Sequence, residues 1–246
     1  MRIDEIEAPD LTGIDMTSVQ TFVDSMRRIP RERVVALNDI LLAKREEYAA
    51  QFASMTTLYH GAPERPYKSA DRTLNVYDEI MANGFKLTQG RRSIGGMGAL
   101  EVVDNLGIFL TDSKTLAHFF GDNRDDHGRG RVITCKVDTS RLLESSKARG
   151  TIVKLGCELV NQYNGTTKTR LAMRDWWWLV DRKPFVDAIK AEGYTGVRFQ
   201  EDVAVRRSAN AFDGHTYFIF DPATIHIKTD YTIAMFYDDL KKGASI

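Results

Sequence analysis

Residues 107–121 read GIFLTDSKTLAHFFG, and their hydrophobic period changes halfway through the segment. Residues 108–110 (IFL) form a short β-branched and aromatic run behind a glycine, which is typical of a strand buried on both faces. Thr111 or Asp112 then offers an N-cap oxygen to a helix. The apolar positions of that helix recur at i, i+3 and i+4, namely Leu116, Phe119 and Phe120. The segment predicts a strand feeding a helix, and ordinary core packing is the simplest interpretation of the apolar stripe.

The composition favours a globular protein without a strong overall electrostatic field. The chain has 246 residues, of which 43% are hydrophobic, so it can bury the core of one moderate domain with or without a helical extension. Its 34 Lys and Arg residues equal its 34 Asp and Glu residues. A global basic field that would hold polyanions is therefore excluded, and nucleic-acid binding would need a local patch.

Cysteine content and the first residues bear on the cellular compartment. Cys135 and Cys157 are too few for a disulfide framework, and they do not belong to a zinc-binding quartet. Residues 1–10 (MRIDEIEAPD) lack the apolar core of a signal peptide, and no apolar run is long enough to cross a bilayer. The charged run 121–130 (GDNRDDHGRG) does not have the spacing of a calcium loop. We expect a cytoplasmic protein without a metal site.

Helical patterns lie on both sides of the central strands. Residues 1–54 predict an acidic leader and two amphipathic helices separated near Pro30, an extension expected to pack against the domain that follows. The run RDWWWLV at residues 174–180 predicts a helix whose tryptophans pack into the core, with exposure to a partner as the alternative. Pro184 and Gly193 bracket a further helix, because proline suits the first turn and glycine the position after the last.

A second predicted strand ends in a histidine and a glycine. Residues 56–61 (TTLYHG) reach a strand end where a side chain can leave the sheet and backbone can approach a ligand. A lone histidine such as His60 is often a structural hydrogen-bonding residue, although imidazole also suits polar recognition. A helix farther along ends at Asn83-Gly84, which tolerate a left-handed C-cap. The glycine-rich run 89–106 matches neither a P-loop nor a dinucleotide fingerprint.

Three segments, taken in order, resemble the catalytic core of the poly(ADP-ribose) polymerase and diphtheria-toxin group of ADP-ribosyltransferases. The segments are LYHG at residues 58–61, NGFKLT at residues 83–88 and GIFLTDSKTLAHFF at residues 107–120. The resemblance implies an α+β fold in which two small, mostly antiparallel sheets with flanking helices surround an NAD cleft. It assigns residues 55–246 to the ADP-ribosyltransferase-like domain and leaves residues 1–54 as an N-terminal helical extension.

The same resemblance assigns individual residues to NAD. His60 and Gly61 match the pair that holds the ribose and the carboxamide, and Phe119 matches the aromatic residue that stacks on nicotinamide. Phenylalanine keeps the ring but lacks the hydroxyl of the usual tyrosine. Where the family has a serine, this chain has Leu116, with Thr115 one place away. The cofactor-binding residues expected from this match are His60, Gly61, Thr115 and Phe119.

The last matching strand departs from the family at one position. In the frame of residues 217–221 (YFIFD), Thr216 stands where the family has a glutamate that binds the ribose and supports the oxocarbenium-like centre. A threonine hydroxyl can form a hydrogen bond but carries no charge. Alternation places Thr216 on the same face of the strand as Phe218 and Phe220. Glu201, across the preceding loop, is an alternative carboxylate. The catalytic residues expected are His60, Thr216 and Glu201.

The function favoured by the resemblance is mono-ADP-ribosylation of a macromolecular acceptor, in which NAD is the substrate and nicotinamide is released. Protein is favoured over nucleic acid as the acceptor. One alternative is an interaction module that binds NAD or ADP-ribose with weak or no catalysis, because Thr216 and Leu116 replace family residues. Another is an RNA 2′-phosphotransferase of the same fold, for which the basic residues would be Arg91, Arg92, His118, Arg206 and Arg207.

Overall fold

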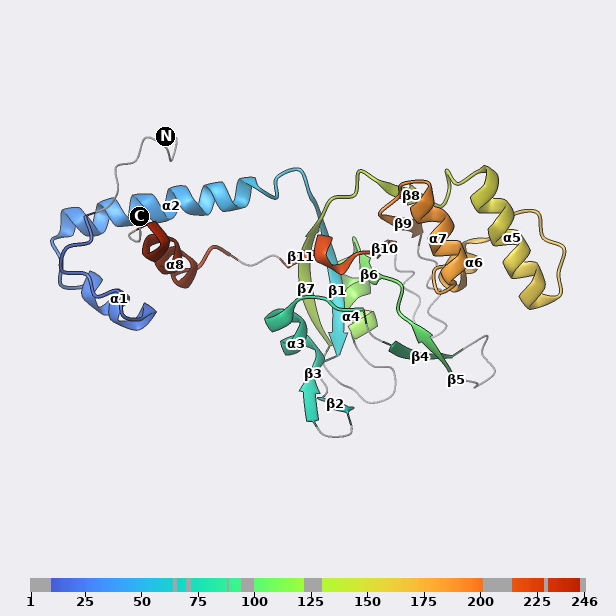
Figure 1. The fold of residues 1–246 in the computed structure, drawn as a ribbon, viewed down its shortest axis with the longest axis horizontal. Helices are drawn as coiled ribbons and strands as arrows, with labels where there is room; N and C mark the ends of the chain where they lie inside the picture. The colour runs from blue at the N-terminus through green and yellow to red at the C-terminus, as the bar shows by residue number, and fades with distance from the viewer. Residues whose placement is uncertain are drawn as a thin grey trace. The chain divides into compact units, whose positions relative to one another are not determined.

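The structure is a computed structural model that describes residues 10–63, 66–69, 72–87, 89–93, 100–121, 130–200, 214–227 and 230–243 (Figure 1). Three residues named above, Glu201, Arg206 and Arg207, lie outside the described residues. The chain divides into two compact units. One is Met1–Ser54 together with Thr229–Ile246, and the other is Met55–Lys228.

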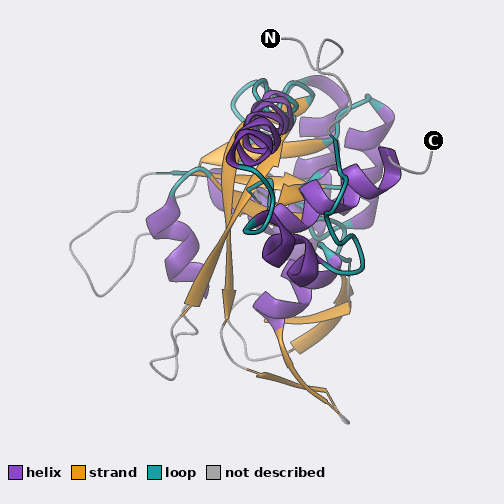
Figure 2. Ribbon diagram, turned by 90° about the vertical axis from the view of Figure 1, so that its left-hand side faces the viewer, coloured by secondary structure: helices purple, strands orange, loops and turns teal. Residues whose placement is uncertain are grey.

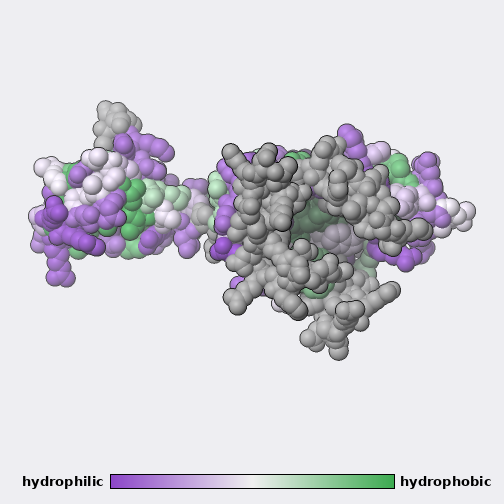
Figure 3. Space-filling view, turned by 90° about the horizontal axis from the view of Figure 1, so that it is seen from below, coloured by the Kyte–Doolittle hydropathy of each residue, from purple (hydrophilic) through white to green (hydrophobic). Residues whose placement is uncertain are grey.

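The first unit contains helices from both ends of the chain. They are α1 (Val19–Met26), α2 (Arg31–Ala50) and α8 (Ile233–Gly243). Ser18 caps α1, because its Oγ accepts the backbone N–H of Thr21 at 3.2 Å. In the space-filling view, hydrophilic residues dominate the outside of this unit, with apolar residues between them (Figure 3).

Aromatic residues at the C-terminal end of the chain complete the core of the first unit. Phe22 is 2% exposed, and its ring centroid lies 6.3 Å from that of Phe236 and 5.8 Å from that of Tyr237. Leu37 and Tyr231 are buried in the same cluster. The apolar sides of the N-terminal helices therefore meet α8, an element that the sequence analysis leaves unassigned. The sequence prediction, in contrast, carries the second domain through to residue 246.

The second unit is built on one seven-stranded mixed sheet (Figure 2). Its strands are β1 (Thr56–Pro63), β6 (Ile108–Thr111), β7 (Gly130–Val137), β8 (Leu142–Glu144), β9 (Gly196–Gln200), β10 (His215–Ile219) and β11 (His226–Ile227). The order is β11-β7-β1-β6-β10-β9-β8, and every neighbouring pair is antiparallel except β8 with β9. Two hairpins form separate two-stranded sheets, namely β2 (Pro66–Ser69) with β3 (Arg72–Asn75) and β4 (Gln89–Ser93) with β5 (Leu100–Asp104).

The α+β class predicted from the sequence is confirmed, and so is the antiparallel majority, but the expected arrangement of two small sheets is wrong. One registered pair, Tyr59 with Thr111, joins β1 to β6 and makes the main sheet continuous. By contrast, β1 pairs with β7 along its whole length, from Thr56 to Pro63. The two halves of the sheet therefore meet at a narrow joint.

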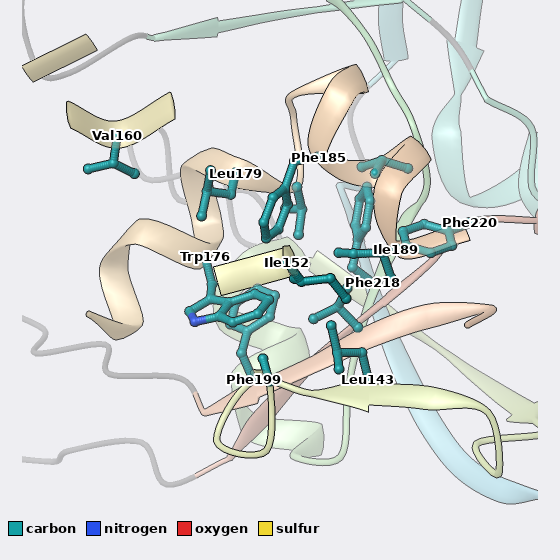
Figure 4. Packing of buried hydrophobic residues seen from close by; sticks show 14 residues of the cluster. Leu143, Ile152, Val160, Trp176, Leu179, Phe185, Ile189, Phe199, Phe218 and Phe220 are labelled. Atoms are coloured by element: carbon teal, nitrogen blue, oxygen red, sulfur yellow. The ribbon is translucent and has the colours of Figure 1, made fainter. Parts of the chain in front are cut away.

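Helices α5 (Gly150–Asn164), α6 (Met173–Leu179) and α7 (Lys183–Ala191) pack their apolar residues against β9 and β10 (Figure 4). Phe218 of β10 and Phe220, the residue after the strand, enter this core, whereas Tyr217 and Ile219 enter a second cluster with residues of β1 and β7. The predicted alternation of this strand is confirmed.

Two further helices, α3 (Val76–Asn83) and α4 (Lys114–Gly121), contact β1. A short 3₁₀-helix, η2 (Pro222–Thr224), follows β10. In the described parts of the chain, no helix has both the length and the apolar character needed to span a membrane.

Phe22→Ala should destabilise the first unit while leaving the main sheet of the second unit folded. Removing a buried phenylalanine ring costs about 3–5 kcal/mol, and the aromatic neighbours of Phe22 belong to α8. Hydrogen exchange should report lost protection in α1, α2 and α8, with β7 and β10 still protected. Leu42→Ala is the control, because Leu42 is 46% exposed on α2. Equal loss of protection in β7 and β10 would show that both units unfold together.

Candidate functional site

The candidate site lies where β1 and β6 separate. Beyond the pair Tyr59 and Thr111, a continued antiparallel ladder would place Gly61 opposite Phe109. Instead, the His60 imidazole reaches β6, with Nδ1 2.9 Å from the Phe109 carbonyl oxygen. A carbonyl oxygen can only accept, so Nδ1 carries the proton and Nε2 is left as an acceptor. A side-chain hydrogen bond thus replaces the backbone ladder at this point.

The surroundings of His60 keep its imidazole neutral. Burial lowers the pKa of His60 below its ordinary value of 6.5, and the hydrogen bond to Phe109 offsets part of this effect. The ring also packs edge-on against Phe85, with centroids 5.0 Å apart and planes at 84°. A neutral imidazole with a fixed tautomer presents one hydrogen-bond acceptor, Nε2, at neutral pH.

A cavity of about 260 Å³ opens at this joint, and we call it the β1–β6 cavity. Ligand pockets usually span roughly 300–1,000 Å³, so this cavity suits a single ring system better than a whole dinucleotide. Its polar side chains include Tyr59 and His60 of β1, Thr111 of β6 and Thr216 of β10. Three strands that are distant in the sequence therefore meet at one small site.

The apolar lining of the β1–β6 cavity is mainly aromatic. Phe109 and Trp177 stack, with centroids 5.0 Å apart and planes at 20°. The Phe120 centroid lies 6.0 Å from that of Trp177, and all three residues line the cavity. Phe120 is 43% exposed. Its ring is therefore accessible to a flat ligand that enters between the aromatic side chains.

The tryptophan run of α6 contributes one residue to the cavity. Successive helix residues point about 100° apart. Trp176 is 3% exposed and packs 5.6 Å from Phe185, as predicted for a core residue. Trp177 lines the cavity, and Trp178 lies 4.8 Å from Tyr163. The prediction that the run packs into the core is confirmed, since Trp176 belongs to the buried cluster and Trp177 and Trp178 are partly buried against it.

Two buried threonines supply hydroxyl groups to the cavity lining. Thr216 and Thr111 are register partners across β10 and β6, and each is 1% exposed. The Oγ1 of Thr111 accepts the backbone N–H of Ser113 at 3.1 Å. Among the described residues that line the cavity, none is an aspartate or a glutamate.

Gly61 allows α4 to lie directly on β1. A Cβ at this position would stand 1.8 Å from the Ala117 carbonyl oxygen and 2.6 Å from the Gly121 backbone nitrogen. Both contacts are with helix backbone, which cannot rotate away as a side chain could. Gly61 also lines the β1–β6 cavity. The glycine is therefore required by the packing of the helix, whatever contact it makes with a ligand.

The N-cap of α4 differs from the prediction. The Oγ of Ser113 accepts the backbone N–H of Leu116 at 3.2 Å, so Ser113 caps the helix. The expectation that Thr111 or Asp112 would do so is wrong, because the strand continues through Thr111 and the helix begins at Lys114. Asp112 is consequently available for a different role.

That role is a clamp between the start of α4 and β10. One Asp112 carboxylate oxygen accepts the His215 backbone N–H at 2.8 Å, and the other lies 3.0 Å from His215 Nδ1 and 3.3 Å from the Tyr217 hydroxyl. Arg198 Nη2 lies 3.3 Å from His215 Nε2. Burial and the neighbouring Asp112 charge raise the pKa of Tyr217. The clamp holds β10 at the residue before Thr216, and the 103-residue separation of Asp112 from His215 explains why sequence reasoning missed it.

Three of the residues assigned to NAD from the sequence come together, since His60, Gly61 and Thr216 all line the β1–β6 cavity. Phe119 lies half-buried on α4, with its ring 5.8 Å from Phe120. Of these two neighbours, Phe120 is the one that lines the cavity. The other expected contact from α4, Thr115, is exposed on the helix.

The remaining expected residues are not among the described residues that line the cavity. Leu116, at the position of the family serine, is fully buried at 0% exposure. Of the basic residues considered for a phosphotransferase, Arg91 and Arg92 belong to β4, and His118 is exposed on α4. Glu201 lies outside the described residues, as noted above.

No protein-family model matches this chain, and a search of curated proteins finds no similar sequence. Within the described ranges, no group of three or more His, Cys, Asp or Glu side chains is arranged to hold a metal ion. Functional interpretation therefore depends on the geometry of the cavity and its surroundings.

His60→Asn should remove a pH dependence of stability. Because the folded-state pKa of His60 lies below 6.5, the unfolded chain takes up a proton first as the pH falls, and the native state loses stability below about pH 6.5. Asparagine can still donate to the Phe109 carbonyl but does not titrate. Between about pH 7.5 and pH 5.5, wild type should lose up to about 1.4 kcal/mol more of its unfolding free energy than the variant. Urea denaturation measures this difference, and identical losses would exclude a His60 whose pKa is lowered in the folded state.

Proposed function

We propose that this protein is an NAD-dependent mono-ADP-ribosyltransferase that uses the β1–β6 cavity to hold the nicotinamide end of NAD. The observation that carries the proposal is the convergence of His60, Gly61 and Thr216 on one small cavity with aromatic walls. The resemblance seen in the sequence relates the same three positions to NAD. Their proximity is an observation separate from the resemblance. In the sheet β6 lies between β1 and β10, yet residues of both strands line the cavity.

The chemistry of the cavity suits a nicotinamide ring. The pyridinium ring of NAD is flat and positively charged, and aromatic faces attract cations by about 0.5–2 kcal/mol. Phe109, Phe120 and Trp177 offer such faces. The volume of about 260 Å³ fits the ring and leaves the adenosine part outside the cavity.

His60 would orient the ribose that carries the ring. Its Nδ1 is bonded to the Phe109 carbonyl oxygen, so Nε2 is the nitrogen that can accept a hydrogen bond from a hydroxyl group of the sugar. Because the imidazole is neutral, it does not repel the pyridinium charge. Gly61 lines the same cavity, so its backbone is the group that would meet the carboxamide of the ring.

In the proposed reaction the bond between the ribose C1′ and the pyridinium nitrogen breaks, and nicotinamide leaves with the bonding electron pair as a neutral molecule. A nucleophilic group of a macromolecular acceptor forms the new bond to C1′ and gives up its proton to solvent or to a nearby base. The positive charge that develops on the ribose is the feature a catalytic site must stabilise.

One observation favours a second function, an NAD- or ADP-ribose-binding module with weak catalysis. The described lining of the cavity holds no carboxylate, and Thr216 supplies a neutral hydroxyl where the related enzymes have a charge. Removing one electrostatic stabiliser typically lowers a rate by about a hundredfold or more. The two functions share the binding step and differ in turnover.

Phe120→Ala should weaken binding of nicotinamide analogues by roughly 2- to 12-fold, because one aromatic stacking interaction is worth about 0.5–1.5 kcal/mol. Phe119→Ala is the matched control, since Phe119 is the adjacent ring on α4. Calorimetry with a nicotinamide analogue and with adenosine separates ring recognition from general collapse, because only the analogue should lose affinity. If neither NAD nor the analogue binds wild type, the cavity is not a nicotinamide site.

Thr216→Glu should raise nicotinamide release from NAD by about tenfold to a hundredfold, because a carboxylate beside C1′ stabilises the developing charge. Thr216→Gln has a similar size without the charge and should not raise the rate. Thermal unfolding of both variants checks that the buried position, 1% exposed in wild type, tolerates the longer side chain. Bound NAD with no turnover in wild type or in the Glu variant would favour the binding module.

A further inference from the structure

A second concave site lies along α5 and α6, apart from the β1–β6 cavity. A cavity of about 880 Å³ is lined by residues of α5 and of the loop 165–172. A smaller cavity of about 270 Å³ is lined by residues of β9 and β10. The two share lining residues, namely Ser145, Ser146, Leu171 and Trp176. The two cavities are therefore adjacent, and we call them together the α5–α6 groove.

Cations outnumber carboxylates in the α5–α6 groove. The cations are Arg149, Lys154, Lys168, Arg170 and Arg198, and the carboxylates are Glu144 and Glu158. The chain as a whole has a formal net charge of zero. The groove is therefore a local basic patch of the kind that a neutral chain needs in order to bind a polyanion.

Some of these cations are already paired. Lys168 Nζ lies 3.0 Å from each carboxylate oxygen of Asp175, which is nearly buried. Lys154 and Glu158 are 4.0 Å apart, and both side chains are largely exposed, so that pair is weak. Within the described parts of the chain, neither Arg149 nor Arg170 forms an ion pair with a carboxylate.

The loop that carries Arg170 is anchored to α5. Asn161 Nδ2 donates to the Lys168 carbonyl oxygen at 2.8 Å, and Asn161 Oδ1 accepts the Lys168 backbone N–H at 2.7 Å. The Lys168–Asp175 ion pair fixes the same loop to α6. On the other side of the groove, Arg149 Nη1 donates to the Ser146 carbonyl oxygen at 2.9 Å. The Arg149 guanidinium is therefore held in place before a ligand arrives, and the backbone that carries Arg170 is fixed to α5.

The smaller cavity contributes a donor that lacks a partner. Arg198 lies 3.5 Å from Glu144 through Nη1 and 3.3 Å from His215 through Nη2. Its Nε is buried and has no hydrogen-bond partner among the described residues. A buried donor without an acceptor costs stability. The Arg198 side chain as a whole is 33% exposed, so an anionic oxygen in the groove would meet the accessible part of the guanidinium rather than Nε.

We propose that the α5–α6 groove binds a single strand of nucleic acid, with phosphates contacting Arg149, Arg170 and Arg198. A strand carries one negative charge at every nucleotide, so consecutive phosphates can reach cations spread over both cavities. An acidic peptide would need a matching run of carboxylates, and the volume far exceeds that of one phosphate group. Binding of nucleic acid in this groove is separate from the proposed transferase function. Where both proposals hold, nucleic acid rather than protein is the favoured acceptor.

Fluorescence anisotropy with labelled oligothymidylate and oligouridylate of roughly twelve nucleotides tests this site. Wild type should bind, with affinity falling steeply between ~50 and ~200 mM salt. Arg149→Ala and Arg170→Ala should each reduce the slope of log K against log salt by about 0.7, and the double variant should bind at least about tenfold more weakly at ~50 mM salt. Arg174→Ala is the matched control, because Arg174 is exposed on α6 and does not line the groove.

Competition separates the possible ligands. If polyglutamate displaces the oligonucleotide at an equal concentration of charge, the proposal is overturned in favour of an acidic peptide. If ADP displaces it, the proposal is overturned in favour of a nucleotide site. Unchanged salt slopes in folded Arg149 and Arg170 variants would also overturn it. Phe120→Ala separates this proposal from the NAD site: it should change nicotinamide binding and leave strand binding intact, so either proposal can fail alone.

Discussion

The hydrogen bond from His60 to the Phe109 carbonyl oxygen is the interaction on which the site depends. Strands β1 and β6 pair at one position and then separate, and a separated pair of strands leaves backbone groups that need partners. The imidazole supplies one such partner across the opening. The sheet stays continuous, and the space between the strands becomes the β1–β6 cavity. A backbone ladder in its place would have closed the cavity, whereas strands without this bond would expose an unpaired carbonyl group to the ligand.

Several residues near the cavity serve the fold and the site at once. Gly61 lets the α4 backbone touch β1, and that contact places Phe120 beside Trp177. Asp112 ties the strand-to-helix junction to β10, which holds Thr216 next to Thr111. Loss of function at these positions would therefore not by itself identify a ligand contact. For this reason binding is best attributed to residues such as Phe120, whose ring is exposed and whose removal leaves the core intact.

The sequence predicted local structure well because local structure depends on periodicity. It predicted the strand-to-helix unit at residues 107–121 and the alternation of β10. The grouping of His60, Gly61 and Thr216 is expected from the resemblance to ADP-ribosyltransferases and not from periodicity. It could not predict that one pair would merge two sheets into one, because periodicity does not specify which strand edges meet. The partnership of α8 with the N-terminal helices and the Asp112 clamp escaped for the same reason, since both depend on contacts between distant segments.

Two of the three consecutive tryptophans of α6 line different concave sites. Trp176 lines the α5–α6 groove, and Trp177 lines the β1–β6 cavity. A helix turns about 100° per residue, so adjacent residues are the ones that can wall two spaces on neighbouring sides of it. Large rigid rings at both positions limit how far either space can extend into the core. Phe199 packs against Trp177 at 5.3 Å and also lines the smaller cavity of the groove. The contact between Trp177 and Phe199 is therefore a shared wall of aromatic side chains between the two sites.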